Sequence, residues 1–297
     1  MTCRCRLPRP GVVRLRVSPA MVVVLAAGLA WAALPSSYAA DVTEADAPAR
    51  GFLPVGELFW PLLADPKQPQ FYVSVRGYEL DGEIVPTAAV AYGETFGLYR
   101  WQSSQGAWQL SLAGALFAQF NLDAPSQDLV NADYTIGVPL TFRRGLYSSR
   151  LRVYHQSSHL GDEFLLRNHP ERINLSFESL ELLASREWLR WRGYLGGEYV
   201  FHREPAGLRP GGLHGGVEYR GATRGIWHPV AAADVKSWDE FDWSPEISLV
   251  AGVELGPREP GRRRLRLLAE AYRGHSPHGQ FFAQRMRYLG LGVYLGF

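Results

Sequence analysis

The feature that most constrains this chain is a period-two alternation of apolar and polar or small residues, repeated along most of its length. In the last segment, YLGLGVYLGF, every second residue from Leu289 to Phe297 is apolar, and tyrosines and glycines fill the positions between. EISLVAGVEL, WQLSLAGALFAQFNL and LRWRGYLGGEYVF alternate in the same way. Because successive side chains of a β-strand point to opposite faces, the pattern predicts long strands with one apolar face.

A soluble sandwich would bury that apolar face, whereas a membrane barrel would turn it towards lipid. The segments are long, and short connections such as SSQG alternate with longer ones such as LGDEFLLRNHPE, which is typical of a barrel. The chain also stops in a strand at Phe297, and this end resembles the C-terminal signal of bacterial outer-membrane barrels. The sequence therefore predicts an all-β fold, a transmembrane antiparallel barrel of about 12 strands.

Residues 1–39 are predicted to be a secretory signal peptide, with five arginines before an apolar run from Met21 and a cleavage motif ending at Ala39. Removing those arginines leaves 26 of the 31 Lys and Arg against 29 Asp and Glu, a net charge of about −3. Nucleic acid is therefore not expected as a partner. Both cysteines, Cys3 and Cys5, lie in the signal, so the exported chain has no disulfide and no thiol nucleophile.

Residues 40–69 are rich in Pro and aromatics without a clear period, and are predicted to be a periplasmic or lumenal lead-in before a barrel over residues 70–297. The strand faces opposite the apolar ones carry charges of both signs. This favours a narrow barrel filled by ion pairs, since wide aqueous channels go with about 16–18 strands. Strands are expected to begin near residues 70, 87, 108, 130, 146, 173, 189, 211, 229, 244, 263 and 284.

The strand SSRLRVYHQSSHL carries polar residues on its lipid-facing side. Parity from Leu151 and Val153 places His155 and Ser157 outward, near the external end of the strand. Residues i and i+2 on one strand face lie about 6.5–7 Å apart, so the imidazole of His155 could accept the Ser157 proton. We expect His155 Nε2 within about 3.5 Å of Ser157 Oγ on the outer wall. The alternative is a strand end that emerges among lipid headgroups, where such residues are ordinary.

A third group that orients the imidazole would come from the returning strand, RINLSFESLELLAS. If its leucines face lipid, Asn174, Ser176 and Glu178 also point outward. A hairpin closing near His159 would set His155 opposite Ser176, and a register shift of two would set it opposite Asn174 or Glu178. Either an amide or a carboxylate could hold the ring.

The lead-in GFLPVGELFWPLLADPKQPQF, with GETFGLYRW and HQSSHLGDEF, resembles an uncharacterised exported outer-membrane protein family, domain of unknown function 1207. That resemblance implies no activity. The His-x-Ser pair is similar to those of outer-membrane phospholipase A, which adds an Asn, and of lipid A deacylase barrels, which add a Glu. The phospholipase resemblance implies calcium, for which Asp162 and Glu163 are candidate oxygen ligands.

These observations favour a serine-dependent lipid acyl-ester hydrolase in the bacterial outer membrane, acting on phospholipid or on lipid A. Ser157 would be the nucleophile, His155 the base, and Asn174 or Glu178 the orienting group. The alternative is a non-enzymatic barrel, either a small-solute channel or a structural protein. Expected partners are outer-membrane lipid, the barrel-assembly machinery through the C-terminal strand, and a second copy of the chain.

Overall fold

The computed structural model describes residues 50–80, 83–170, 172–223, 225–256 and 263–296. The predicted signal peptide, both cysteines and Phe297 lie outside these ranges. No helix in the described ranges is long and apolar enough to span a membrane.

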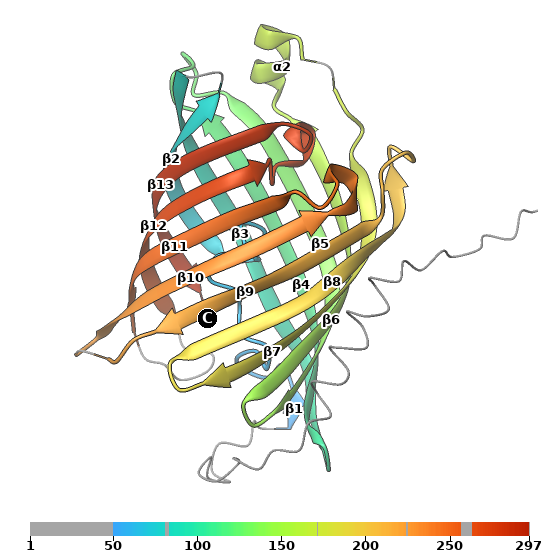
Figure 1. Cartoon of the computed structure of the whole chain (residues 1–297), viewed down its shortest axis with the longest axis vertical. Helices are drawn as coiled ribbons and strands as arrows, with labels where there is room; N and C mark the ends of the chain where they lie inside the picture. The colour runs from blue at the N-terminus through green and yellow to red at the C-terminus, as the bar shows by residue number, and fades with distance from the viewer. Residues whose placement is uncertain (1–49, 81–82, 171, 224, 257–262, 297) are drawn as a thin grey trace, which may run out of the picture.

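Twelve antiparallel strands, β2 to β13, form a closed barrel in which β13 pairs with β2 and each other strand pairs with its neighbours in sequence (Figure 1). The predicted all-β barrel is confirmed, and each strand begins within four residues of its expected start. The strands are β2 (Phe71–Leu80), β3 (Glu83–Ser103), β4 (Gly106–Asn121), β5 (Leu129–Arg144), β6 (Tyr147–Leu160), β7 (Ser176–Trp188), β8 (Trp191–Glu204), β9 (Gly211–Arg220), β10 (Trp227–Trp238), β11 (Pro245–Leu255), β12 (Arg264–His275) and β13 (Arg285–Gly296).

The two ends of the barrel differ in their connections. A seven-residue helix, α2 (Asp162–Asn168), follows β6 at one end, where short 3-10 turns η2 (Asp239–Phe241) and η3 (Gly279–Phe281) also lie. At the opposite end β5 and β6, like β7 and β8, are joined by two residues (Figure 1). Long loops mark the outer rim of a bacterial barrel and short turns the periplasmic rim, so we call the α2 end the outer rim.

The wall has an apolar outside and a polar inside, as the alternation predicts. Leu289 and Leu291 on β13 are 72 % and 71 % exposed on the outer face. On the inner face Arg150 and Arg152 of β6 are buried, and both form ion pairs with Glu181 of β7 at 2.9 Å. The charged residues therefore sit where lipid cannot reach them.

The lead-in runs inside the barrel. After β1 (Gly51–Phe52) pairs with the periplasmic half of β3, the blue segment of residues 53–70 lies within the ring of strands (Figure 1). Three wall arginines donate hydrogen bonds to its carbonyls, which fixes its path. Arg100 bonds Gly56 O at 2.8 Å, Arg143 bonds Leu58 O at 2.6 Å, and Arg192 bonds Trp60 O at 2.8 Å.

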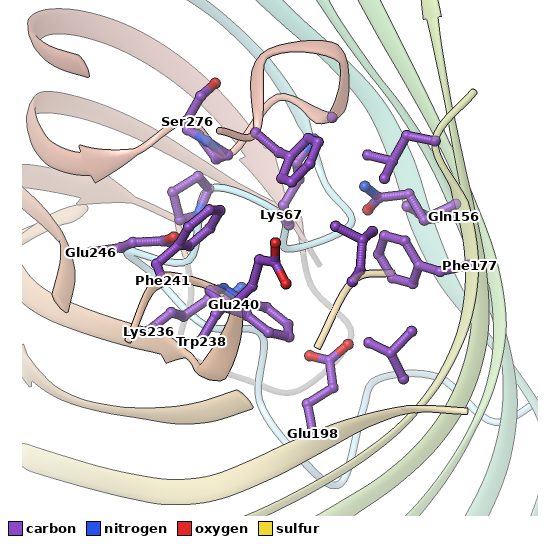
Figure 2. Close-up of a pocket in the computed structure, with 18 of the residues that line it drawn as sticks. Lys67, Gln156, Phe177, Glu198, Lys236, Trp238, Glu240, Phe241, Glu246 and Ser276 are labelled. Carbon is purple, nitrogen blue, oxygen red and sulfur yellow. The ribbon is translucent and has the colours of Figure 1, made fainter. Parts of the chain in front are cut away.

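Apolar and charged contacts also hold the lead-in in the lumen. Phe59 and Leu62 are fully buried against Leu183 and Tyr194 of the wall. Near the outer rim Lys67 pairs with Asp133, and Lys236 Nζ lies 2.7 Å from Asp65 Oδ1. A cavity of about 160 Å³ remains on that side, lined by Lys67, Phe177, Trp238, Phe241 and other residues (Figure 2). The lead-in and its contacts therefore occupy part of the lumen.

Candidate functional site

β6 presents two different faces. Arg152, Gln156 and Ser158 are buried on the inner side, whereas Leu151 and Val153 are exposed on the outer side. The same parity places His155 and Ser157 on the outer wall, both partly exposed, close to the end of β6 at the outer rim. In HQSS, His155 and Ser157 therefore lie on the outer face of β6, and Gln156 and Ser158 lie on the inner face.

Glu178 on β7 lies beside His155. The two residues are directly opposite each other in the β6–β7 register. His155 Nδ1 is 2.8 Å from Glu178 Oε1, and 39 % of the His155 side chain and 33 % of the Glu178 side chain are exposed. When Nδ1–H donates to the carboxylate, Nε2 is the unprotonated ring nitrogen and can accept a proton.

A second imidazole reaches the same carboxylate from β8. His202 Nδ1 lies 2.5 Å from Glu178 Oε2, so Glu178 is held between two histidines. Strict alternation from Tyr199 would turn His202 into the lumen, but the β7–β8 register shifts between Glu178 and Ser179. This β-bulge places one extra residue, Phe201, on β8 and returns His202 to the outer face. Sequence reasoning missed His202 because alternation alone carries no sign of a bulge.

Ser157 is the remaining member of the predicted pair. It shares the outer face of β6 with His155 and lies opposite Tyr134 of β5 and Ser176 of β7. In the described part of the chain no hydrogen bond joins Ser157 Oγ to His155, which differs from the contact expected from the sequence. Catalytic hydrogen bonds are often long without substrate and tighten when it binds.

Of the registers considered from the sequence, the structure has the alternative shifted by two residues, which sets Glu178 opposite His155. The first expectation, Ser176 opposite His155, was wrong, because Ser176 pairs with Ser157. The cause is the connection: α2 and an extended segment occupy residues up to 175, so β7 begins at Ser176 rather than near 173. Asn174 is exposed in that connection, outside the strand, and does not reach the imidazole.

The other expected site residues lie apart from this cluster. Asp162 and Glu163 occupy the first turn of α2 and are exposed. No group of three or more His, Cys, Asp or Glu that could hold a metal ion occurs among the described residues. Asp162 and Glu163 therefore belong to no such group in the described ranges.

The inner polar residues of the same stretch belong to the packing of the lumen. Ser158 Oγ hydrogen-bonds Asp133 and, at 3.1 Å, Asn131, and its carbonyl accepts a bond from Gln280 in the loop after β12. Gln156 on β6 and Phe177 on β7 point into the lumenal cavity (Figure 2). The inward direction of Phe177 agrees with the outward direction of its neighbour Glu178.

The outer cluster of Ser157, His155, Glu178 and His202 borders an apolar surface. Ile136 of β5 lies directly opposite His155, and Val153 of β6 and Leu180 of β7 lie two residues closer to the periplasmic rim than His155 and Glu178. All three are exposed on the outside. Polar groups on a lipid-facing wall cost less near the interface than at the midplane. The cluster therefore lies at the outer-rim end of an exposed apolar wall.

Known structures share the fold at low sequence identity. The Salmonella typhi outer membrane phospholipase dimer with bound calcium matches with a TM-score of 0.55 and 14% identity, covering 78% of this chain and 94% of that chain. Outer membrane phospholipase A from Escherichia coli matches with a TM-score of 0.56 and 14% identity, covering 79% and 94%. These similarities show an outer-membrane type of barrel and nothing finer.

Family membership rests on the sequence itself. No curated protein matches this chain. Residues 25–297, including the whole described barrel, match one family model. The chain belongs to the family described as "Protein of unknown function (DUF1207)".

Proposed function

We propose that this barrel is a lipid acyl-ester hydrolase that acts on lipids of the outer leaflet of the bacterial outer membrane. The observation that carries the proposal is the contact of 2.8 Å between Glu178 Oε1 and His155 Nδ1 on the outer wall. A carboxylate that holds Nδ1 leaves Nε2 as the base, and Ser157 lies two residues away on the same face. The outer-membrane phospholipases with the same fold support the proposal by analogy.

In the proposed reaction Ser157 Oγ attacks the carbonyl carbon of a lipid ester while His155 Nε2 takes the hydroxyl proton. Glu178 keeps the ring oriented and stabilises the imidazolium that forms. The tetrahedral intermediate then collapses, and His155 gives its proton to the departing alcohol oxygen. Water, deprotonated by His155, hydrolyses the acyl-serine, releases the fatty acid and restores the enzyme.

The position of the cluster supports a substrate that approaches through the membrane. Acyl chains would lie along the exposed apolar wall next to β5, β6 and β7, and the ester would then be near the outer rim. The channel alternative is not favoured, because the lead-in occupies the lumen and is bonded to the wall by Arg100, Arg143 and Arg192. Outer-membrane location, a homodimer and the barrel-assembly machinery stay predictions.

The test is fatty-acid release by the full-length exported chain, refolded in detergent, from a diacyl phospholipid and separately from lipid A. We expect Ser157→Ala to lower the rate by at least about a thousandfold. Ser149→Ala is the matched control, because Ser149 lies on the outer face of the same strand near the periplasmic end. Full activity of Ser157→Ala, or no release from either lipid by the wild-type chain, contradicts the proposal.

A further inference from the structure

A group of arginines lies on the outer wall at the outer rim, far around the barrel from Ser157. Arg273 ends the exposed face of β12, and Arg285 and Arg287 begin that of β13. Four strands, β8 to β11, separate them from β7 on one side, and β2 to β5 separate them from β6 on the other. This arginine group is therefore a feature independent of the proposed catalytic cluster.

The register brings these positive charges together. Arg273 and Arg287 are directly opposite each other on β12 and β13, and Arg285 lies two residues from Arg287 on the same face. Facing side chains on neighbouring strands have Cβ atoms about 4.5–5.5 Å apart, and like charges in such a pair destabilise the sheet. The protein alone gives no reason for this arrangement.

Too few negative groups compensate the three guanidinium groups. Arg287 forms an ion pair with Glu79 of β2, and Arg285 Nη2 donates to the hydroxyl of Ser244 at 2.5 Å. The guanidinium group of Arg273 forms no hydrogen bond or ion pair with any residue in the described ranges. One carboxylate thus faces three guanidinium groups, which leaves two positive charges at this place.

The arginine group lines a hollow in the outer surface. Its volume is about 510 Å³, and Glu79, Ser244, Pro245, Ile247, Gly274 and Met286 complete its lining. Towards the periplasmic rim the wall becomes apolar, with exposed Leu289 on β13 and Leu249 on β11. The hollow therefore combines a cationic upper part with a lipid-facing surface beneath it.

We propose that this hollow binds the phosphate of an outer-leaflet lipid headgroup, with the acyl chains lying against the apolar wall below. Guanidinium groups bind phosphate oxygens through paired, charge-assisted hydrogen bonds. An anion between Arg273 and Arg287 would remove their mutual repulsion. Arginines at the membrane interface attract anionic lipid, and acyl chains below the hollow distinguish such a lipid from free phosphate.

The test is native mass spectrometry of the full-length exported chain in detergent, with bisphosphorylated lipid A, its phosphate-free analogue, or inorganic phosphate as the probe. The Ser157→Ala background prevents hydrolysis of the probe. We expect Arg273→Gln with Arg285→Gln to weaken binding of the phosphorylated lipid at least tenfold. Arg172→Gln with Arg190→Gln removes the same charge from exposed positions elsewhere and should leave binding unchanged.

Three outcomes would overturn the lipid-phosphate site. The two double variants could lose binding equally, which would indicate general charge attraction. The phosphate-free analogue could bind as tightly as the phosphorylated lipid. Inorganic phosphate could bind as tightly as the lipid and depend on the same arginines, which would make the hollow a site for the free anion. Retained mobility of the folded barrel on unheated gels shows that the variants are assembled.

Discussion

The inner and outer faces of β6 and β7 carry similar residue types with different physical roles. On the inner face Arg150, Arg152 and Glu181 form a buried ion-pair group, and Ser158 bonds a carboxylate. On the outer face Glu178 bonds two imidazoles, and Ser157 lies beside them without a hydrogen bond to His155. Packing of the lumen accounts for the inner group, whereas no packing requirement accounts for the outer one.

The difference shows that position on the strand distinguishes the two groups better than residue type does. Charged residues inside a barrel are expected, because the lumen is polar and each sign can find its opposite. Polar groups on the lipid-facing wall cost free energy, though less near the interface than at the midplane, and the proposed hydrolysis would give this group a role. Substitutions should therefore affect activity on one face and stability on the other.

The largest expected effect is on the outer face. Glu178→Ala should slow lipid hydrolysis by between about 10² and 10⁴-fold, because nothing then fixes the orientation of the His155 imidazole. The unfolding midpoint in urea should stay close to that of the wild type, since the carboxylate is partly exposed. If Glu178→Ala lowered the unfolding midpoint as strongly as the activity, the outer face would also be needed for stability and the comparison would fail.

A substitution on the inner face of β7 should have the reverse effect, a loss of stability without a loss of activity. Glu181 lies three residues after Glu178. Glu181→Ala leaves the buried guanidinium groups of Arg150 and Arg152 without their carboxylate. Removing one partner of a buried ion pair costs about 3–5 kcal/mol, and this should lower the free energy of unfolding measured by urea titration. The molecules that remain folded should hydrolyse lipid at the wild-type rate. An unchanged urea midpoint would contradict the role given to the inner face.

The adjacent serines sharpen the comparison further. Ser158→Ala removes a buried hydrogen bond to Asp133 and should cost about 1–3 kcal/mol of stability without a change in the hydrolysis rate. Ser157→Ala should lower the hydrolysis rate and leave the free energy of unfolding unchanged. Urea titration and fatty-acid release on the same two preparations measure both effects, and a slower rate in Ser158→Ala would break the assignment.

A smaller effect is expected for His202, which acts through Glu178. His202→Ala removes one exposed hydrogen bond worth about 1 kcal/mol, so hydrolysis should slow by about fivefold. His202→Gln retains a donor and should recover part of the loss. The pH profile of kcat/KM distinguishes a positioning role from a folding defect. Loss of a positioning residue should shift the pH midpoint of the profile, whereas a smaller folded fraction lowers kcat/KM by the same factor at every pH.

The smallest expected effect concerns the lead-in inside the barrel. Burial raises the pKa of Glu57 to about 8, and nearby Glu94 also raises it, whereas Arg150 and Arg192 lower it. The folded state therefore binds a proton that the unfolded state releases above pH 4.5, so stability falls as pH rises from 4.5 to about 8. In Glu57→Gln the part of this fall that Glu57 contributes should disappear, so the fall should become smaller. Thermal midpoints at about pH 5 and about pH 9 measure it, and parallel curves for both proteins would contradict the raised pKa.

Alternation was enough to predict the barrel and the faces of β6, because side-chain direction in a strand has a strict period of two. Alternation alone predicts His155 and Ser157 outside and Gln156 and Ser158 inside, and the structure has them there. Strand starts were also close, since Gly, Pro and charged clusters mark the connections. The direction of each side chain on β6 could be inferred without knowing which strands pair with it.

Register and bulges could not be predicted in the same way. The connection after β6 includes α2, and its length determines which residue of β7 faces His155. The extra residue at Phe201 reverses the parity of β8 and brings His202 to Glu178. The sequence also left open whether the lead-in is periplasmic or lumenal, because a segment without a period contains no signal of its neighbours.

The lead-in also links parts of the barrel wall that are not neighbours. Residues 53–70 precede β2, and both ends of this segment connect to wall strands near the periplasmic rim, β1 through its pairing with β3 and β2 directly. The hydrogen bonds from Arg100, Arg143 and Arg192 join the segment to β3, β5 and β8. Since these three strands do not pair with one another, the lead-in acts as an internal brace between distant sides of the wall.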